Sequence, residues 1–405
     1  MKRSSLMSFD LDRARRETSG CENRIHFNNA GAALMPTPVV DAMTAHIKRE
    51  AEIGGYEAQA EAEAAGRLDI HGAAARFLNA GHKEIALAES ATRAWDMAFY
   101  GAVAGLGLKA GDRILTCSAE YASTQIAFLQ VAKRCGVEIV PVPDNETGQI
   151  SLKHLEAMID QRTRLISLTH VPTNCGLVNP AESVGEIARK AGIPYFLDAC
   201  QSAGQLPLDV KAIGCDVLTF TGRKYLRAPR GTGILYVRAD FLERIEPPFL
   251  DLHAAPLKTA DTYEIRPDAR RFESWETNIA ARAGLKSALD YAMDWDVAAI
   301  AERIEKLASQ LRQGLEAIPG IKIHDQGKVL CGIVGFSHTR HDPEKIRTEL
   351  AREGVNIHIS YPASTWTDSA LRNLPPLLRA SVHYYNSETE IERFLNLLEG
   401  MTGKG

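Results

Sequence analysis

The chain has 405 residues, 45% of them hydrophobic, so it can bury a large core and is expected to fold as one large domain and a smaller one. The 47 Lys and Arg residues against 51 Asp and Glu give a net charge of −4, which argues against nucleic acid as a main partner. Seven scattered cysteines without a C-x-x-C pair indicate reduced thiols and no zinc or other metal site. No apolar run suits a membrane span, and we expect a soluble, cytoplasmic protein.

The chain order predicts three segments. Residues 1–24 are charged and polar and are expected to form an N-terminal arm. Residues 25–285 are expected to form the large domain, and residues 286–405 a small C-terminal domain, with 25–50 as a candidate to pack against the latter. From 84 to 237, short apolar runs alternate with helical patterns, which is typical of a mostly parallel sheet with helices on both faces. Residues 57–78 are expected to form a single helix.

An acid and a lysine follow two of the predicted strands. Asp198 ends the apolar run 194–197, and Lys224 follows the run 216–221 after a short polar turn. Such a pair suits an aldehyde cofactor with a pyridine ring, because a lysine can hold the aldehyde and a carboxylate can keep the ring nitrogen protonated. Arg223 would favour loss of the lysine proton. For these two residues alone, a structural acid and a surface lysine are the alternative.

The surrounding motifs resemble those of the class V aminotransferase and cysteine desulfurase family, which are pyridoxal 5'-phosphate (PLP) enzymes of fold type I. The resemblance rests on Asp198-Ala199-Cys200-Gln201, then Thr221-Gly222-Arg223-Lys224, then the Gly-rich run 231–237. It covers roughly residues 25 to 400. It implies an α/β fold with a mostly parallel sheet in the large domain, a smaller α+β domain, and a homodimer with shared active sites.

The resemblance also implies a role for individual residues. Lys224 would form the aldimine with PLP and then move the α-proton of an amino-acid substrate, and Asp198 would face the ring nitrogen. The substrate is expected to meet Asn29 and, through its carboxylate, Arg379. Whether Thr173 or Asn174 contacts the cofactor is left open. The other residues expected to bind the cofactor are Ala91, Thr92, Tyr121, Gln201, Thr221, Arg223 and, from the partner chain, Thr277.

The expected reaction follows from a missing residue. Cysteine desulfurases need a nucleophilic cysteine shortly before the arginine strand, and residues 354–381 contain none. The sequence His170-Val-Pro-Thr-Asn and the run 223–233 resemble the corresponding segments of the ergothioneine-pathway sulfoxide lyase and isopenicillin N epimerase-like branch. We therefore expect a β-eliminating C–S lyase that converts a cysteine S-oxide conjugate into pyruvate and ammonia.

Several alternatives share the same residues. An amino-acid epimerase and a class V aminotransferase are the main ones. A cysteine desulfurase or selenocysteine lyase is less favoured for want of the cysteine, and the non-enzyme alternative is a degenerate PLP-fold scaffold subunit. The leaving group and the roles of Arg93 and Glu276 are not defined by the sequence.

Overall fold

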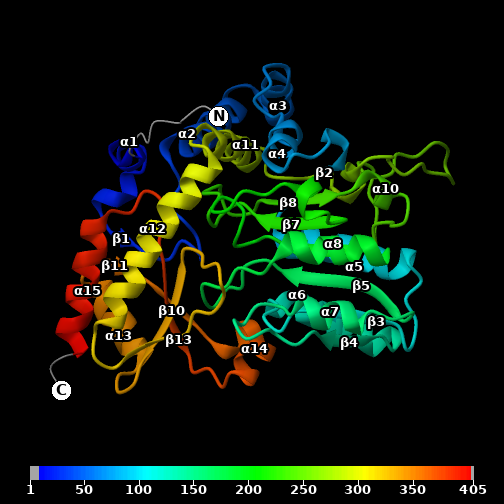
Figure 1. The fold of residues 1–405 in the computed structure, drawn as a ribbon. Coiled ribbons are helices and arrows are strands. Elements are labelled where there is room, and N and C mark those ends of the chain that lie inside the picture. Colours follow the sequence, from blue (N-terminus) through cyan, green and yellow to red (C-terminus); the bar gives the residue numbers. More distant parts are fainter. Residues whose placement is uncertain (1–8, 403–405) are drawn as a thin grey trace, which may run out of the picture.

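The computed structural model describes residues 9–402, so the first part of the expected N-terminal arm lies outside the described residues. A seven-stranded sheet forms the larger part of the molecule (Figure 1). In spatial order its strands are β2 (Ile85–Ala88), β8 (Gly233–Val237), β7 (Val217–Thr221), β6 (Tyr195–Asp198), β5 (Thr163–Thr169), β3 (Arg113–Thr116) and β4 (Glu138–Pro141). The strands from β7 to β4 are parallel to one another, whereas β8 is antiparallel to both β2 and β7. The expected α/β fold with a mostly parallel sheet is confirmed.

Helices precede, connect and follow these strands. The single helix expected over 57–78 is wrong, because the chain turns between α3 (Gly55–Ala64) and α4 (Ile70–Leu78). Gly66 takes a left-handed φ of 68°, and the Asp69 carboxylate caps the second helix by accepting from the Gly72 amide at 3.0 Å. The helices of this part are α2 (Thr37–Ile53), α3 (Gly55–Ala64), α4 (Ile70–Leu78), α5 (Ala91–Gly105), α6 (Ala122–Cys135), α7 (Leu152–Met158), α8 (Ala181–Ala191), α9 (Val210–Ile213), α10 (Ala239–Leu242) and α11 (Ile279–Asp294).

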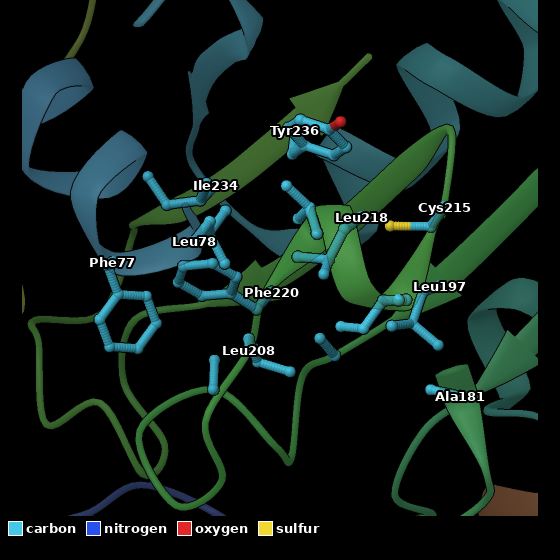
Figure 2. Packing of buried hydrophobic residues seen from close by; sticks show 14 of the residues in the cluster. Phe77, Leu78, Ala181, Leu197, Leu208, Cys215, Leu218, Phe220, Ile234 and Tyr236 are labelled. Carbon is cyan, nitrogen blue, oxygen red and sulfur yellow. The ribbon is translucent and has the colours of Figure 1, made fainter. Parts of the chain in front are cut away.

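Apolar side chains cover both faces of the large sheet. On one face Leu218 and Phe220 of β7 pack with Phe77 of α4 (Figure 2). On the other face Phe196 and neighbouring residues pack against Trp95 of α5. Because both faces are buried, the central strands read as continuous apolar runs that stop abruptly where the polar loops begin.

The smaller part contains a four-stranded antiparallel sheet beside the large one (Figure 1). Its strands, in spatial order, are β12 (His358–Ser360), β13 (Leu377–Ser381), β10 (Ile333–His338) and β9 (Ile321–Ile323). The chain's early strand β1 (Ile25–His26) pairs in parallel with β11 (Val355–Asn356), so this early segment joins the smaller part. The accompanying helices are α12 (Val297–Glu316), α13 (Pro343–Arg352), α14 (Trp366–Leu371) and α15 (Glu388–Thr402), and 3₁₀ turns lie at Ser19–Glu22, His82–Glu84, Ala269–Phe272 and Pro362–Thr365.

The described portion of the expected arm packs on the rest of the chain. Helix α1 (Leu11–Arg16) buries Ala14, and Arg13 of the same helix forms an ion pair with Asp294 at 2.7 Å. The buried Arg227 donates to the Thr18 hydroxyl at 2.5 Å. Within residues 9–402, no helix is both long and apolar enough to cross a membrane.

Candidate active site

A cavity of about 300 Å³ opens where β5, β6 and β7 end and α5 begins. This is the edge of a parallel sheet at which ligands collect, because the loops that follow the strands converge there. The structure brings most of the predicted site residues together around this one cavity. Those that line it are Ala91, Thr92, Tyr121, Thr173, Asp198, Gln201, Thr221, Arg223 and Lys224.

Asp198 and Lys224 meet because their strands are parallel neighbours. Asp198 is opposite Thr219 in the register of β6 and β7, and Lys224 follows shortly after β7 ends. The Asp198 carboxylate accepts from the Cys200 amide at 2.8 Å, which holds it in place. Burial lowers the pKa of Lys224, and the nearby Arg223 cation acts in the same direction. A lysine that loses its proton more easily is a better nucleophile.

An aromatic ring lies near the lysine. The Lys224 nitrogen is 5.9 Å from the centroid of the Tyr121 ring. Tyr121 immediately precedes α6 and is 37% exposed, so one face of its ring is available to a ligand. A planar cofactor ring could therefore stack on it.

The beginning of α5 forms an anion site. Ser90 caps the helix by accepting from the Arg93 amide at 3.1 Å, and the first N–H groups of a helix have no acceptor within it. Gly233 of β8 permits the close approach, since a Cβ there would lie 2.6 Å from the Ser90 carbonyl carbon. Thr221 of β7 pairs with Gly233 of β8, so the Thr221 side chain also lies near the beginning of α5. The Arg93 side chain turns away and lies 4.1 Å from the centroid of the Phe249 ring.

Arg379 lies behind the cavity wall on β13. It is only 4% exposed, and its Nη1 donates to the Thr173 carbonyl at 2.8 Å and to the Thr173 hydroxyl at 2.9 Å. Its Nη2 donates to Asn28 Oδ1 at 3.2 Å, while its buried Nε has no partner among the described residues. Burial lowers the pKa of Arg379 to about 10. The Thr173 hydroxyl also accepts from Gln201 at 3.2 Å and thereby links this arginine to the cavity.

Asn174 and Asn29 are two of the four predicted residues that do not line the cavity. Asn174 is buried and donates to Asp368 on α14 at 2.8 Å, so of the adjacent pair it is Thr173 that lines the cavity. Asn29 is fully buried; its amide donates to the Ser381 carbonyl at 2.7 Å and accepts from the Tyr385 hydroxyl. The structure therefore does not place Asn29 in the cavity, because both ends of its amide already hold the framework together.

Thr277 does not line the cavity of its own chain. Its buried hydroxyl has no hydrogen-bond partner among residues 9–402. The neighbouring Glu276 is exposed to solvent, and its position indicates no role within the chain.

Sequence reasoning missed several cavity residues. Arg230, Cys200 and Thr169 line the cavity, and the first two stood inside motifs that the sequence analysis quoted. Glu120, next to Tyr121, is buried and accepts from Thr169 at 2.7 Å and from Ser167 at 3.0 Å. Burial raises the pKa of Glu120, although these hydroxyls oppose the shift. Only the pairing of β3 with β5 reveals this carboxyl behind the site.

Comparison with known proteins identifies the class. The family model described as "Aminotransferase class-V" matches residues 25–394, and the chain belongs to this PLP-dependent family. A protein named "Probable cysteine desulfurase" from Methanothermobacter thermautotrophicus is 30% identical in an alignment 398 residues long that covers 96% of this chain and 98% of the relative. A cysteine desulfurase from Shigella flexneri is 27% identical in an alignment 416 residues long, gaps included, that covers 97% of this chain and 98% of the relative.

Solved structures support the same fold. The apo cysteine desulfurase from Thermococcus onnurineus NA1 superposes with a TM-score of 0.89 at 24% identity, covering 99% of this chain and 100% of the other. The cysteine desulfurase CsdA from Escherichia coli gives a TM-score of 0.88 at 22% identity, covering 97% of this chain and 98% of the other.

The comparisons correct the expected reaction. β-Elimination from a cysteine S-oxide conjugate was favoured because the chain lacks the usual cysteine, and that expectation is wrong: relatives matched over nearly their whole length are named cysteine desulfurases. The absence of one cysteine side chain does not outweigh similarity over nearly the whole chain. Placement in the ergothioneine and epimerase-like branch is not confirmed by these relatives, whereas membership of class V is.

The residues of the cavity fit PLP. The beginning of α5 after Ser90 and the nearby Gly233 provide a cradle for a phosphate, and a buried lysine of lowered pKa suits an aldehyde. A strand-end carboxylate suits a protonated ring nitrogen. The buried Gln201 Oε1 has no partner among the described residues and is available to a ligand.

Proposed function

We propose that the protein removes sulfur from L-cysteine, leaves L-alanine, and passes the sulfur to a thiol from outside the chain. The observation that carries this proposal is the presence of two basic side chains in one site. Lys224 loses its proton easily, and the buried Arg379 is linked to the cavity through Thr173. An amine-binding and a carboxylate-binding group together suit an α-amino acid. The names of the full-length relatives support cysteine as that amino acid.

We assign the parts of the cofactor to separate residues. The α5 N-terminus with Ala91 and Thr92, together with Thr221 and Arg230, would hold the phosphate. Asp198 would hold the ring nitrogen, and Tyr121 would cover the ring. PLP, when bound, supplies an electron sink for negative charge at the substrate α-carbon.

The chain's own residues position the substrate and move its protons. Arg379 would hold the α-carboxylate in a bidentate pair, geometry that a lysine does not reproduce. The Lys224 nitrogen would carry the α-proton, since its lowered pKa lets it release a proton more easily than an exposed lysine does. The loop 28–33 is held beside the cavity, because Asn28 accepts a hydrogen bond from Arg379 and the Ala30 carbonyl accepts one from Gln201.

The sulfur step balances without an oxidant. The C–S bond of cysteine breaks, a new S–S bond forms with the external thiol, and the carbon gains a proton, so L-cysteine and a thiol become L-alanine and a persulfide. The chain's own thiols are poorly suited as acceptors. Cys200 lines the cavity, but burial raises the pKa of its thiol, with Asp198 acting in the same direction, and burial likewise raises the pKa of Cys331 to about 12. Residues 354–381 contain no cysteine.

The test follows L-cysteine through the holoenzyme. Alanine, sulfide and pyruvate are measured with and without a small thiol such as dithiothreitol. We expect alanine and sulfide in equal amounts, turnover that rises with the thiol concentration, and no persulfide on the protein by intact mass. Lys224→Ala should abolish turnover. Absence of alanine, or pyruvate in its place, contradicts the proposal.

We also propose a homodimer in which Thr277 reaches the phosphate of the partner's site. The exposed Trp275 and Glu276 beside it leave this segment accessible to a second chain, and the Thr277 hydroxyl has no hydrogen-bond partner within residues 9–402. Mixed dimers of Lys224→Ala and Thr277→Ala chains test it, because one of the two sites then contains both intact residues. Activity of the mixture above the sum of the parents is expected. A simple sum would contradict a shared site.

A further inference from the structure

We infer that Glu120 is a positioning residue that holds a second negative charge behind Asp198 and thereby helps to keep the ring nitrogen of PLP protonated. The inference rests on the proposed function only in letting Asp198 face the ring nitrogen, and it is independent of the fate of the sulfur. Glu120 does not line the cavity, and none of the steps assigned above uses it.

Three hydroxyl groups surround the Glu120 carboxylate. Thr116 of β3 donates to its Oε1 at 2.5 Å, Ser167 of β5 donates to Oε1 at 3.0 Å, and Thr169 of β5 donates to Oε2 at 2.7 Å. Glu120 is only 4% exposed. Burial raises its pKa, but hydrogen bonds from hydroxyl donors favour the ionised form and oppose that rise. The arrangement is therefore built for a carboxylate that keeps its charge.

No basic side chain neutralises this carboxylate. Within residues 9–402, no salt bridge reaches Glu120, whereas Asp325, whose side chain is 2% exposed, pairs with Arg312 at 2.7 Å. A buried anion without a counter-charge is unfavourable, and a cation bound nearby relieves that cost. The cation that the site is expected to receive is the protonated ring of the cofactor.

Thr169 connects Glu120 to the acid of the site. Thr169 and Asp198 are register partners on the parallel strands β5 and β6, and both line the cavity. Partners on adjacent strands lie about 4.8 Å apart and point to the same face of the sheet. The charge of Asp198 contributes to the raised pKa of Glu120, so the two carboxylates act on one another. The other titratable groups that act together with Glu120 are Cys117 and Tyr195, and neither carries a positive charge.

Two negative charges near one ring nitrogen favour its protonated form more strongly than one does. A neighbouring negative charge raises the pKa of any group that becomes cationic when it gains a proton. A protonated ring nitrogen in turn makes the ring a better electron sink. We therefore assign the direct contact to Asp198 and the supporting charge to Glu120.

The experiment compares two cofactor analogues that differ only at the ring nitrogen. Pyridoxine 5'-phosphate has an alcohol in place of the aldehyde, so it binds reversibly and forms no bond to Lys224. The second compound, the carbon analogue, has a C–H group in place of the ring nitrogen and cannot be protonated there. Both are titrated by calorimetry into the full-length chain freed of PLP, at one mildly alkaline pH. We expect the wild type to bind the nitrogen compound at least about tenfold more tightly than the carbon analogue.

Three variants separate the charge of Glu120 from its structural contacts. Glu120→Gln removes the charge and keeps the size, so the preference for the nitrogen compound should fall about tenfold, with carbon-analogue binding within about twofold. Glu120→Asp keeps the charge and should retain much of the preference. Asp216→Asn is the matched control, because it removes a buried carboxylate just before β7, at the other end of that strand from Lys224, and should leave the preference unchanged.

The outcomes that overturn the inference are specific. If Glu120→Gln weakens both analogues equally, Glu120 only supports the shape of the site. An unchanged preference in Glu120→Gln, or a loss in Glu120→Asp as large as in Glu120→Gln, shows that its charge does not act on the ring. If Glu120→Gln folds poorly, the wild type still decides, because equal binding of the two analogues leaves no ring charge for Glu120 to stabilise.

The desulfurase proposal fails separately. If L-cysteine gives no alanine while the preference depends on Glu120 as described, only the proposed reaction is wrong. If alanine forms and the preference does not depend on Glu120, only the role of Glu120 is excluded.

Discussion

Asn174 donates from Nδ2 to Oδ2 of Asp368 at 2.8 Å, and both side chains are buried. Asp368 lies on α14, its amide donates to the Ser118 carbonyl at 3.0 Å, and Arg372 pairs with its carboxylate at 3.3 Å. The loop after β5 is therefore tied to a helix that stands shortly before the arginine strand β13. This tie turns Asn174 outward from the cavity and leaves Thr173 to face it.

Asp368→Ala should destabilise the fold. The substitution leaves Asn174 and Arg372 without their buried partner, so we expect a loss of about 2 kcal/mol in the free energy of unfolding. Urea unfolding followed by circular dichroism measures it. Asp240→Ala, which removes an exposed carboxylate on α10, is the matched control and should change the stability by less than about 0.5 kcal/mol. Equal effects of the two changes would show that the Asn174–Asp368 bond contributes little.

Arg379→Lys and Arg379→Gln should weaken substrate binding and not cofactor binding. Lysine keeps the charge but cannot form the bidentate pair, so we expect KM for L-cysteine to rise by about tenfold with lysine and about 100-fold with glutamine. The visible absorbance of bound PLP should remain. Steady-state kinetics and titration of apoprotein with PLP measure the two effects. A parallel loss of PLP would place Arg379 at the cofactor instead of at the substrate.

Lys224 should react at a lower pH than an ordinary lysine. Burial disfavours its charged form, so more of it is deprotonated at a given pH than for an exposed lysine of pKa about 10.4. Apoprotein mixed with PLP at a series of pH values is trapped with borohydride, and the modified peptide is quantified by mass spectrometry. The midpoint for Lys224 should lie below that of the exposed Lys190 in the same digest. A midpoint at or above that of Lys190 would rule out the lowered pKa.

Glu273 should make stability depend on pH below about pH 5. Burial alone would raise the pKa of this carboxylate, but the contact with His253 at 3.4 Å, the hydrogen bond with His71 at 2.6 Å and the charge of Arg282 outweigh burial and lower the pKa to about 2. A carboxylate whose pKa is lower in the folded state stabilises the fold above its unfolded pKa of about 4.3, and this contribution is lost as the pH falls toward 2.

The corresponding measurement compares the wild type with Glu273→Gln. Glutamine keeps an acceptor for the Leu87 amide, which donates to Glu273 at 2.9 Å, and removes the charge. The difference in unfolding free energy between the two proteins should shrink by about 2 kcal/mol between about pH 5 and about pH 3. A difference that stays constant with pH would mean that folding does not lower the pKa of this carboxylate.

Much of the large sheet was predictable from the chain alone. The runs ending at Asp198 and before Lys224 are buried on both faces, so they read as apolar strands with abrupt polar ends, and the parallel order followed from the alternating helices. The helix break at Gly66 was missed because an Ala- and Glu-rich segment keeps a high helix propensity on both sides of the turn.

The local pattern determined which residues could carry the chemistry: a lysine, an acid and a helix start, each at the end of a short apolar run. Which of two adjacent side chains faces the cavity, Thr173 or Asn174, depends on Asp368, a partner nearly two hundred residues away. The same holds for Arg223, whose direction is set by the Gly31 carbonyl, and for Glu120, which is brought behind the site by strand pairing. The sequence pattern indicates local periodicity and where strands and helices end. The direction of a side chain and the balance of charge around it depend on contacts between distant segments, and only the tertiary structure supplies these contacts.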